Sequence, residues 1–246
     1  MSRVKEKFIV LDTETANSVD EPLPYDIGWA VCDRDGYIYE KRSFLVAEIF
    51  LDMKDLMKSA YYADKIPNYW NDVKSGKRQI RGMWNIRRLM LDDIRMYNIK
   101  KVGAYNMAFD QKSTNNLMRY VSKSWLRWWL PYGMETFCIW HMACQVLADR
   151  PTYVKFAEEN GLISSAGNVQ TSAESIYKYL TNNPNFAESH TGLEDVEIEV
   201  EIMAKCYSQH KKMETGINRL CWRIPQKRFH DYRQKAIDEI ASWLEL

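Results

Sequence analysis

Residues 8–15 read Phe-Ile-Val-Leu-Asp-Thr-Glu-Thr, so that four apolar residues lead directly into two acids. A continuous apolar run of this length is typical of a strand buried on both faces. Because side chains alternate along a strand, Asp12 and Glu14 point to the same side. Neighbouring carboxylates at the edge of a core repel each other, and a hard divalent cation such as Mg²⁺ or Mn²⁺ is the simplest partner for them. The alternative is that the strand ends in solvent at Asp12.

The chain around this stretch predicts a mixed α/β sheet. Residues 27–32 form a second apolar run, and the turn residues 33–36 precede a third strand from Tyr37 to about Ala47, which makes a three-stranded antiparallel unit. Later segments alternate between helical and strand patterns, as is typical of α/β domains. In chain order we expect a helix at 51–60, a helix at 80–97, a strand at 101–105 and helices at 107–121, 136–147, 151–160, 172–180, 192–207 and 229–246.

Composition limits the class of protein. The chain has 246 residues, of which 46% are hydrophobic, and a formal net charge of +1. No apolar run approaches the roughly 18 residues that cross a bilayer, and the first residues lack the apolar stretch of a secretory signal. Five cysteines without a CxxC pair fit reduced core thiols better than disulfides or a zinc site. We therefore expect a soluble cytoplasmic protein with no membrane partner.

Asp110 lies where the predicted strand at 101–105 turns into a helix. Its carboxylate falls in the first helical turn, beside the carboxyl end of the strand. There it is either a metal ligand or an acid that complements the positive end of the helix dipole. The residues alone leave both alternatives open.

His190 and Asp195 stand at the start of the predicted helix at 192–207. Thr191 and Glu194 fit a capping box, in which Thr191 is the N-cap residue. This places His190 just before the helix and Asp195 in its first turn. Both side chains can therefore face one cleft, which a five-residue spacing within a single helix would not allow.

Residues 119–132 are unusually aromatic and basic. The candidates to contact nucleic acid are Trp125, Arg127, Trp128 and Trp129, because aromatic faces stack on bases without sequence preference and arginine neutralises phosphates. The alternative is that the tryptophans of this segment are core and rim residues, since adjacent tryptophans cannot share one face.

Three motifs occur in order along the chain: D-x-E at 12–14, N-x-x-x-D at 106–110 and H-x4-D at 190–195. Together they resemble the DEDDh (DnaQ-like) family of 3′→5′ exonucleases in the ribonuclease H-like superfamily. The resemblance covers over four fifths of the chain, and the stretch at 167–190 is similar to bacteriophage-encoded members. It implies an α/β ribonuclease H-like fold with a central five-stranded mixed sheet flanked by helices. Gly192 stands where the family often has alanine.

The resemblance implies a metal-dependent exonuclease that hydrolyses the 3′-terminal phosphodiester of single-stranded nucleic acid, with DNA favoured, and releases 5′-nucleoside monophosphates. Two Mg²⁺ or Mn²⁺ ions would be bridged by Asp12, and His190 would be the general base. The expected metal ligands are Asp12, Glu14, Asp110 and Asp195. The expected contacts to the 3′ end of the substrate are Thr13, Thr15 and Asn106, with Trp125 and Arg127 from the aromatic segment.

We expect an exonuclease domain over residues 1–210 and a basic, helical C-terminal extension over residues 211–246 that packs on it. The extension can hold the upstream phosphates of a strand through its basic residues. It can also brace the domain through its apolar residues. Among the bracing candidates are Ile237, Ile240, Trp243 and Leu244.

Two other functions remain open at this point. One is an exonuclease directed to RNA or short oligoribonucleotides, because no motif reveals how the site treats a 2′-hydroxyl. The other is a catalytically silent nucleic-acid-binding module in a polymerase or replication assembly. The complete set of five catalytic residues argues against silence. If the chain is phage-encoded, the expected location is the host cytoplasm.

Overall fold

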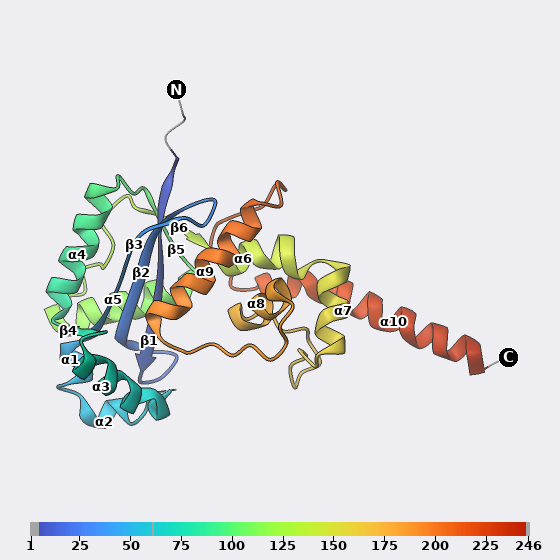
Figure 1. Ribbon diagram of the computed structural model, residues 1–246, viewed down its shortest axis with the longest axis horizontal. Coiled ribbons are helices and arrows are strands. Elements are labelled where there is room, and N and C mark those ends of the chain that lie inside the picture. Colours follow the sequence, from blue (N-terminus) through green and yellow to red (C-terminus); the bar gives the residue numbers. More distant parts are fainter. Residues whose placement is uncertain (1–4, 61, 245–246) are drawn as a thin grey trace.

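The computed structural model describes residues 5–60 and 62–244, with side chains described as far as residue 239. Its strands are β1 (Lys7–Ala16), β2 (Leu23–Asp33), β3 (Ile38–Val46), β4 (Gln79–Arg81), β5 (Lys101–Ala104) and β6 (Glu135–Cys138). They form one mixed sheet in the order β4-β3-β2-β1-β5-β6 (Figure 1). β1, β2 and β3 are antiparallel neighbours, whereas β1 pairs in parallel with β5.

Helices cover both faces of the sheet and the region beyond the carboxyl end of β1. They are α1 (Ala47–Phe50), α2 (Lys54–Met57), η1 (Ala63–Lys65), α3 (Ile66–Ser75), α4 (Met83–Met96), α5 (Met107–Ser122), α6 (Ile139–Ala143), η2 (Cys144–Ala148), α7 (Pro151–Glu159), α8 (Ala173–Thr181), α9 (Gly192–Tyr207), η3 (Cys221–Arg223) and α10 (Ile224–Leu244). α4 and α5 lie on one face and α9 crosses the other (Figure 1). Within the described residues, none of the helices combines the length and apolar character needed to cross a bilayer.

The alternation of side chains along β1 divides the core into two parts. Ile9 and Leu11 pack with residues of α4 and α5, whereas Phe8 and Val10 pack with residues of α6, α7 and α9. All four side chains are fully buried, which explains why this run contains no polar residue. Asp12 continues the second of these faces and therefore points toward α9.

The antiparallel unit agrees with the prediction, but the sheet has six strands rather than five. The additional strand is β4, which overlaps the start of the segment at 80–97 that we predicted as one helix. β4 pairs in parallel with β3, and α4 begins only after Gly82. A three-residue strand is too short to show a period of its own, so the sequence pattern merges it with the helix that follows.

Two predicted helices are wrong in part. The segment at 136–147 begins as β6, which pairs in parallel with β5 and only then turns into α6 and η2. Thr136 and Phe137, a β-branched and an aromatic residue, favour this strand. The segment at 51–60 holds only the short α2, and the sequence prediction does not include α3.

β1 does not end at Asp12, as the solvent alternative required. The strand continues to Ala16, and Asp12 and Glu14 lie opposite Gly28 and Asp26 of β2. The pairing register shifts immediately after Glu14. The two acids therefore stand inside the sheet, where their charges need a partner.

The first part of the C-terminal extension packs on the rest of the molecule. Cys221 and Phe229 are fully buried. The carbonyl of Thr215 accepts the backbone N–H of Cys138 at 2.8 Å, at the end of β6. These contacts are those of a structural brace.

The last part of the extension leaves the body of the molecule as α10 (Figure 1). α10 begins at Ile224, earlier than the predicted Phe229. Residues 233–239 are exposed, and Ile237, which we expected to pack on the domain, exposes 56% of its surface. The other three predicted contacts lie outside the residues whose side chains are described, namely Ile240, Trp243 and Leu244.

Candidate active site

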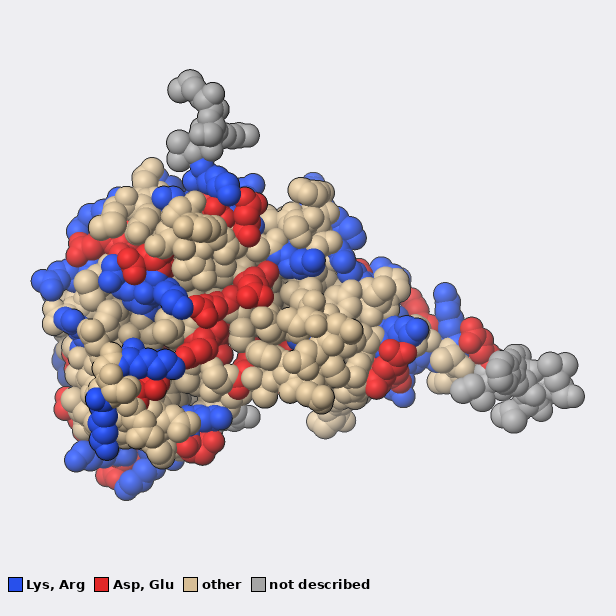
Figure 2. Space-filling model, viewed as in Figure 1, with Lys and Arg blue, Asp and Glu red and all other residues tan. Residues whose placement is uncertain are grey.

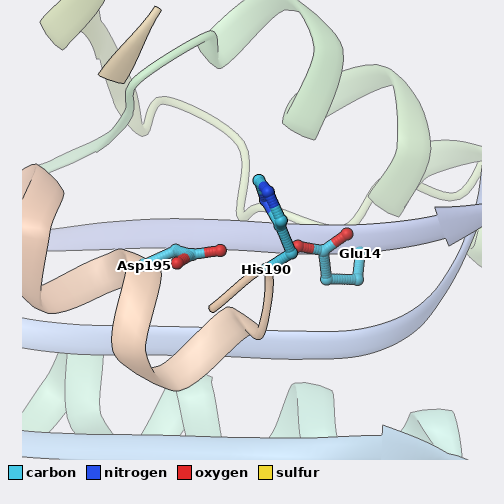
Figure 3. A group of neighbouring side chains, drawn as sticks. All are labelled: Glu14, His190 and Asp195. Carbon is cyan, nitrogen blue, oxygen red and sulfur yellow. The ribbon is translucent and has the colours of Figure 1, made fainter. Parts of the chain in front are cut away.

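Five carboxyl groups meet where β1, α5 and α9 come together. This carboxylate cluster consists of Asp12, Glu14, Asp110, Asp195 and Glu199. Four of its members expose 8% of their surface or less, and the remaining one, Asp12, is partly buried. Figure 3 shows Glu14 on β1, Asp195 on the first turn of α9 and His190 just before that helix. The structure thus brings together the four predicted metal ligands and the predicted base.

A close approach between two glycines positions the start of α9. Gly28 lies opposite Asp12 in the sheet, and a Cβ on Gly28 would lie 1.9 Å from the carbonyl oxygen of Gly192. Only a residue without a Cβ allows the backbone of α9 to begin directly against β2. The N–H of Gly192 then donates to Asp26 at 3.1 Å. Asp195, three residues into α9, is consequently held beside Asp12.

The residues before α9 confirm one part of the predicted cap and correct another. Thr191 is the N-cap residue, but its hydroxyl donates to the Glu194 carboxylate instead of accepting a backbone N–H. His190 precedes the helix with a φ of 54°, a left-handed conformation that is uncommon for residues other than glycine. This turn of the chain brings a ring nitrogen of His190 and a carboxylate oxygen of Asp195 within 4.8 Å of each other.

Asp110 is held by the neighbouring strand. The hydroxyl of Thr13 donates to Asp110 Oδ1 at 2.8 Å, and Ser113 Oγ lies 2.9 Å from the same hydroxyl. All three residues are buried. Thr13, which we predicted as a substrate contact, therefore uses its side chain inside the protein to orient Asp110.

Burial and mutual repulsion raise the pKa values of the cluster. Burial is the largest cause for every member. It raises the pKa of Glu14 to about 9, with repulsion by Asp195 as the next cause, and the pKa values of Asp110 and Asp195 to about 7. The pKa values of Asp12 and Glu199 also lie well above their usual range. The charged groups among the largest causes of these shifts are all other acids.

Two oxygens of the cluster, Asp12 Oδ2 and Asp195 Oδ1, are buried and have no hydrogen-bond partner. Buried polar atoms are rarely left in this state. Glu14, His190 and Asp195 also each present one ligand atom, and these three atoms lie within 4.8 Å of one another. Unpartnered carboxylate oxygens from two facing elements fit a hard divalent cation, which prefers oxygen ligands and would offset the repulsion.

His190 stands at the rim of the cluster. Its ring stacks on Tyr62, with centroids 3.9 Å apart and planes inclined by 11°. Tyr69 donates its hydroxyl to the backbone carbonyl of His190 at 3.4 Å. Burial is the main cause that lowers the pKa of His190, so the imidazole is neutral at pH 7 and can accept a proton.

The sequence analysis missed three acids. Glu199 accepts a backbone N–H at 3.0 Å inside the cluster, and it follows Asp195 by four residues, so helical periodicity could have identified it. Glu174 and Glu188 gather around His190. Burial raises the pKa of Glu188 to about 8, and its Oε2 lies 3.9 Å from His190 Nδ1. Glu188 stands only two residues before His190, so its position in the sequence could have indicated it. Glu174 lies on α8, and no local pattern connects it with the site.

The outer side of α9 is acidic as well. Figure 2 shows acidic side chains gathered along the middle of this face of the molecule, where α9 runs. Glu194 and Glu197 pair there with Lys77 and Lys41. These acids form a solvated, salt-bridged helix face, unlike the cluster on the inner side.

The predicted substrate contacts fall into two groups. Thr15 and Asn106 lie beside the cluster, since Thr15 follows Glu14 on β1 and Asn106 is the exposed N-cap residue of α5. Trp125 and Arg127 belong to a loop that follows the far end of α5. At about 1.5 Å per residue, this loop begins roughly 18 Å along the helix from the cluster.

No family model matches this chain, and no curated protein matches it. Several solved structures resemble it. A zinc-bound complex of E. coli exonuclease I with single-stranded DNA has a TM-score of 0.50 and 14% sequence identity, over 84% of this chain and 41% of that chain. A full-length 3′-exonuclease has a TM-score of 0.50 and 10% identity, over 87% and 64%. Cell-death related nuclease 4 has a TM-score of 0.52 and 9% identity, over 87% and 67%.

The chain thus spans about two fifths of the length of exonuclease I and about two thirds of the other two proteins. The likeness covers most of this chain at an identity of 14% or less. It establishes the fold, which is the mixed α/β ribonuclease H-like fold of these exonucleases, as the sequence predicts.

Proposed function

We propose that this protein is a metal-dependent 3′→5′ exonuclease that removes 5′-nucleoside monophosphates from the 3′ end of single-stranded DNA. The observation that carries the proposal is the pair of buried, unpartnered oxygens of Asp12 and Asp195 within a cluster of five acids. The fold shared with exonuclease I, whose structure holds single-stranded DNA, supports the substrate class.

Asp12, Glu14, Asp110 and Asp195 would hold two Mg²⁺ or Mn²⁺ ions. Bound there, the ions would supply positive charge that favours an attacking hydroxide and the leaving 3′-oxygen. Glu199 accepts the backbone N–H at the end of β5 and adds negative charge behind Asp12. Thr13 orients Asp110 by its hydrogen bond of 2.8 Å.

His190 is the proposed general base. The oxygen of a water molecule would form a bond to the terminal phosphorus while the bond from phosphorus to the 3′-oxygen of the preceding nucleotide breaks, and His190 would take the proton of the water. The protonated ring would gain from the negative charge of Glu174, which already favours the charged form of His190. The stack on Tyr62 fixes the ring plane. Thr15 and Asn106 are the proposed contacts to the terminal nucleotide.

The test uses single-stranded DNA and RNA labelled at the 3′ or the 5′ end, each with Mg²⁺, Mn²⁺ or EDTA. We expect release of the 3′ label as a mononucleotide, stepwise shortening of the 5′-labelled strand and no reaction in EDTA. Asp12→Asn should be inactive, whereas Asp35→Asn, at an exposed turn, should retain full activity. Preference for RNA would redirect the proposal to an RNA exonuclease, and activity of Asp12→Asn would contradict the metal site.

His190→Ala separates the base from the metal ligands. A general base contributes about 10² to 10⁴-fold to the rate, so kcat should fall by that factor while calorimetry with Mn²⁺ shows nearly unchanged affinity. Because the pKa of His190 is lowered, the acid limb of the wild-type rate profile should lie below the usual value of about 6.5. Loss of Mn²⁺ binding in the variant would instead make His190 a ligand.

A further inference from the structure

Three exposed tryptophans and two arginines form two cation–π groups where α4, the end of α5 and the loop after it meet. We call this surface the tryptophan platform; it consists of Trp84, Arg119, Trp125, Arg127 and Trp128. The guanidinium of Arg119 lies 5.4 Å from the ring centroid of Trp125 and 5.0 Å from that of Trp128. The guanidinium of Arg127 lies 5.3 Å from the ring of Trp84. The three indoles expose 43%, 78% and 54% of their surface, in chain order.

The exposure of these rings is built into the loop. Trp129 anchors it, because this side chain is 1% exposed and its backbone N–H donates to Asn115 Oδ1 at 2.9 Å. Since adjacent side chains point in different directions, the burial of Trp129 turns Trp128 outward. Clusters of large exposed aromatic residues on a soluble protein usually mark a binding surface.

The platform is also positively charged. Between residues 111 and 134 the chain carries four basic residues and no acid. Arg87 of α4 lies close enough to Arg127 for the two charges to repel, which together with burial lowers the pKa of Arg87. Cations that face one another in this way favour an anionic ligand.

We propose that the tryptophan platform binds single-stranded nucleic acid at the part of the strand that lies upstream of the 3′ end. Bases stack on the outer faces of Trp125 and Trp128, and Arg119 and Arg127 neutralise phosphates. The position upstream rests on the proposed function, which places the 3′ end at the carboxylate cluster. The distance of roughly 18 Å along α5 corresponds to about five stacked nucleotides at ~3.4 Å each, so only longer strands reach both sites.

The experiment measures the affinity for 5′-fluorescent oligothymidylates of three and fifteen nucleotides by anisotropy in EDTA, where no hydrolysis occurs. The variants are Trp125→Ala and the double variant Trp125→Ala, Trp128→Ala. The matched control is Tyr37→Ala, an aromatic residue 63% exposed at the turn between β2 and β3. Because Trp125 is the most exposed indole of the platform, its single variant tests the proposal even if the double variant is unfolded.

We expect the fifteen-nucleotide strand to bind the parent more tightly than the three-nucleotide strand. The variants should lose about 5- to 150-fold in affinity per stacked base for the long strand, with no change for the short one. Arg127→Gln should reduce the slope of log K against log salt by roughly 0.7. On long substrates with metal, the tryptophan variants should show a raised KM and an unchanged kcat.

Unchanged affinity of Trp125→Ala for the long strand would overturn the proposal. An equal loss for both strands would overturn it as well, because the tryptophan would then act at the terminal nucleotide or on the fold. If the parent self-associates and Trp125→Ala does not, the surface is a protein contact. Tryptophan-dependent binding of the long strand without hydrolysis in any metal would leave the platform standing and reject the proposed function.

Discussion

Asp26 and the carboxylate cluster are buried acids that lie next to each other, and they differ in which charges surround them. Asp26, fully buried on β2, accepts hydrogen bonds from Arg78 Nη1 at 2.6 Å, from Ser43 at 2.9 Å and from Gly192 N–H at 3.1 Å. Glu14, its register partner on β1, has no basic group among the causes of its shifted pKa.

Asp26 has a structural role, whereas the carboxylate cluster carries the proposed chemistry. A buried carboxylate costs several kcal/mol unless a cation or several hydrogen bonds compensate it. Around Asp26 the fold supplies that cation itself, through Arg78, and the result ties β2, β3 and the start of α9 together. In the carboxylate cluster, no basic group is among the main causes of the shifted pKa values. Charge pairing thus distinguishes Asp26, which links parts of the fold, from the acids of the cluster, for which we propose a metal ion as the partner.

We expect the largest effect on stability when Asp26 loses the cation that pairs with it. Arg78→Met leaves Asp26 buried without its cation and should lower the free energy of unfolding by about 3–5 kcal/mol in urea denaturation. Arg34→Met, which removes an exposed partner of Glu6, is the control and should cost no more than about 1 kcal/mol. Equal losses in the two variants would show that Asp26 does not depend on Arg78.

The carboxylate cluster should instead make the stability of the protein depend on added metal ions. Mg²⁺ at a hundred times its dissociation constant should stabilise the parent by about 2.7 kcal/mol, seen as a higher melting temperature that EDTA reverses. Asp12→Asn should lose this shift. The Arg78→Met protein, although less stable, should keep it, since its damage lies in the other group. A shift that survives in Asp12→Asn would place the ion elsewhere.

Without metal, the protein should become less stable as the pH rises, whereas in ordinary acid denaturation a protein becomes less stable as the pH falls. A carboxyl group with a raised pKa holds its proton more tightly when folded, so its contribution is present at low pH and is lost as the pH rises through the folded value. Burial raises the pKa of Asp110 and Asp195 to about 7 and that of Glu14 to about 9. The stability in EDTA should therefore fall as the pH rises from about 4 to 9.

Glu14→Gln sharpens this test, because it removes a group whose pKa is raised to about 9. The variant should lose most of the decline between pH 7 and 9 and keep the decline below 7. Saturating Mg²⁺ should flatten the profile of the parent. A parent that gains stability between pH 5 and 9 in EDTA would contradict the assignment of these acids as uncompensated.

The smallest effect concerns the orientation of one ligand. Thr13→Val removes the hydroxyl that donates to Asp110 Oδ1 and lowers its pKa, a bond worth about 1 kcal/mol. The Mg²⁺ concentration for half-maximal activity should rise by less than about tenfold. Thr114→Val is the matched control, because its buried hydroxyl donates to the backbone carbonyl of Asp110 and not to the carboxylate. The control should leave the Mg²⁺ requirement unchanged.

Much of the site could be predicted because its members lie in short, ordered motifs. The apolar run before Asp12 fixes the strand and its two faces, and Thr191 marks the start of α9. Each inference depends on residues no more than about six positions apart. These local relations also explain why the bounds of α9 match the predicted helix at both ends.

The remaining features depend on contacts between distant segments. Arg78 follows Asp26 by 52 positions, and no sequence pattern near either residue predicts that they form a pair. Glu174 becomes a neighbour of His190 only because the irregular segment that carries Glu188 folds back on α8. β4 is a strand only because its backbone pairs in parallel with the edge of β3. Local periodicity does not contain such information.

The contact between Gly28 and Gly192 has a consequence for how this sequence can change. A Cβ at 192 would meet the backbone nitrogen of Gly28 at 3.0 Å, a tight contact that a small shift of the chain can relieve. A Cβ at 28 would overlap the carbonyl of Gly192 at 1.9 Å, which no rotamer change relieves. The two positions should therefore tolerate substitution unequally during evolution. Selection for a working protein should retain glycine at 28 while admitting alanine at 192, because a single methyl group at 28 would keep α9, with Asp195, away from β2 and from the acids of β1.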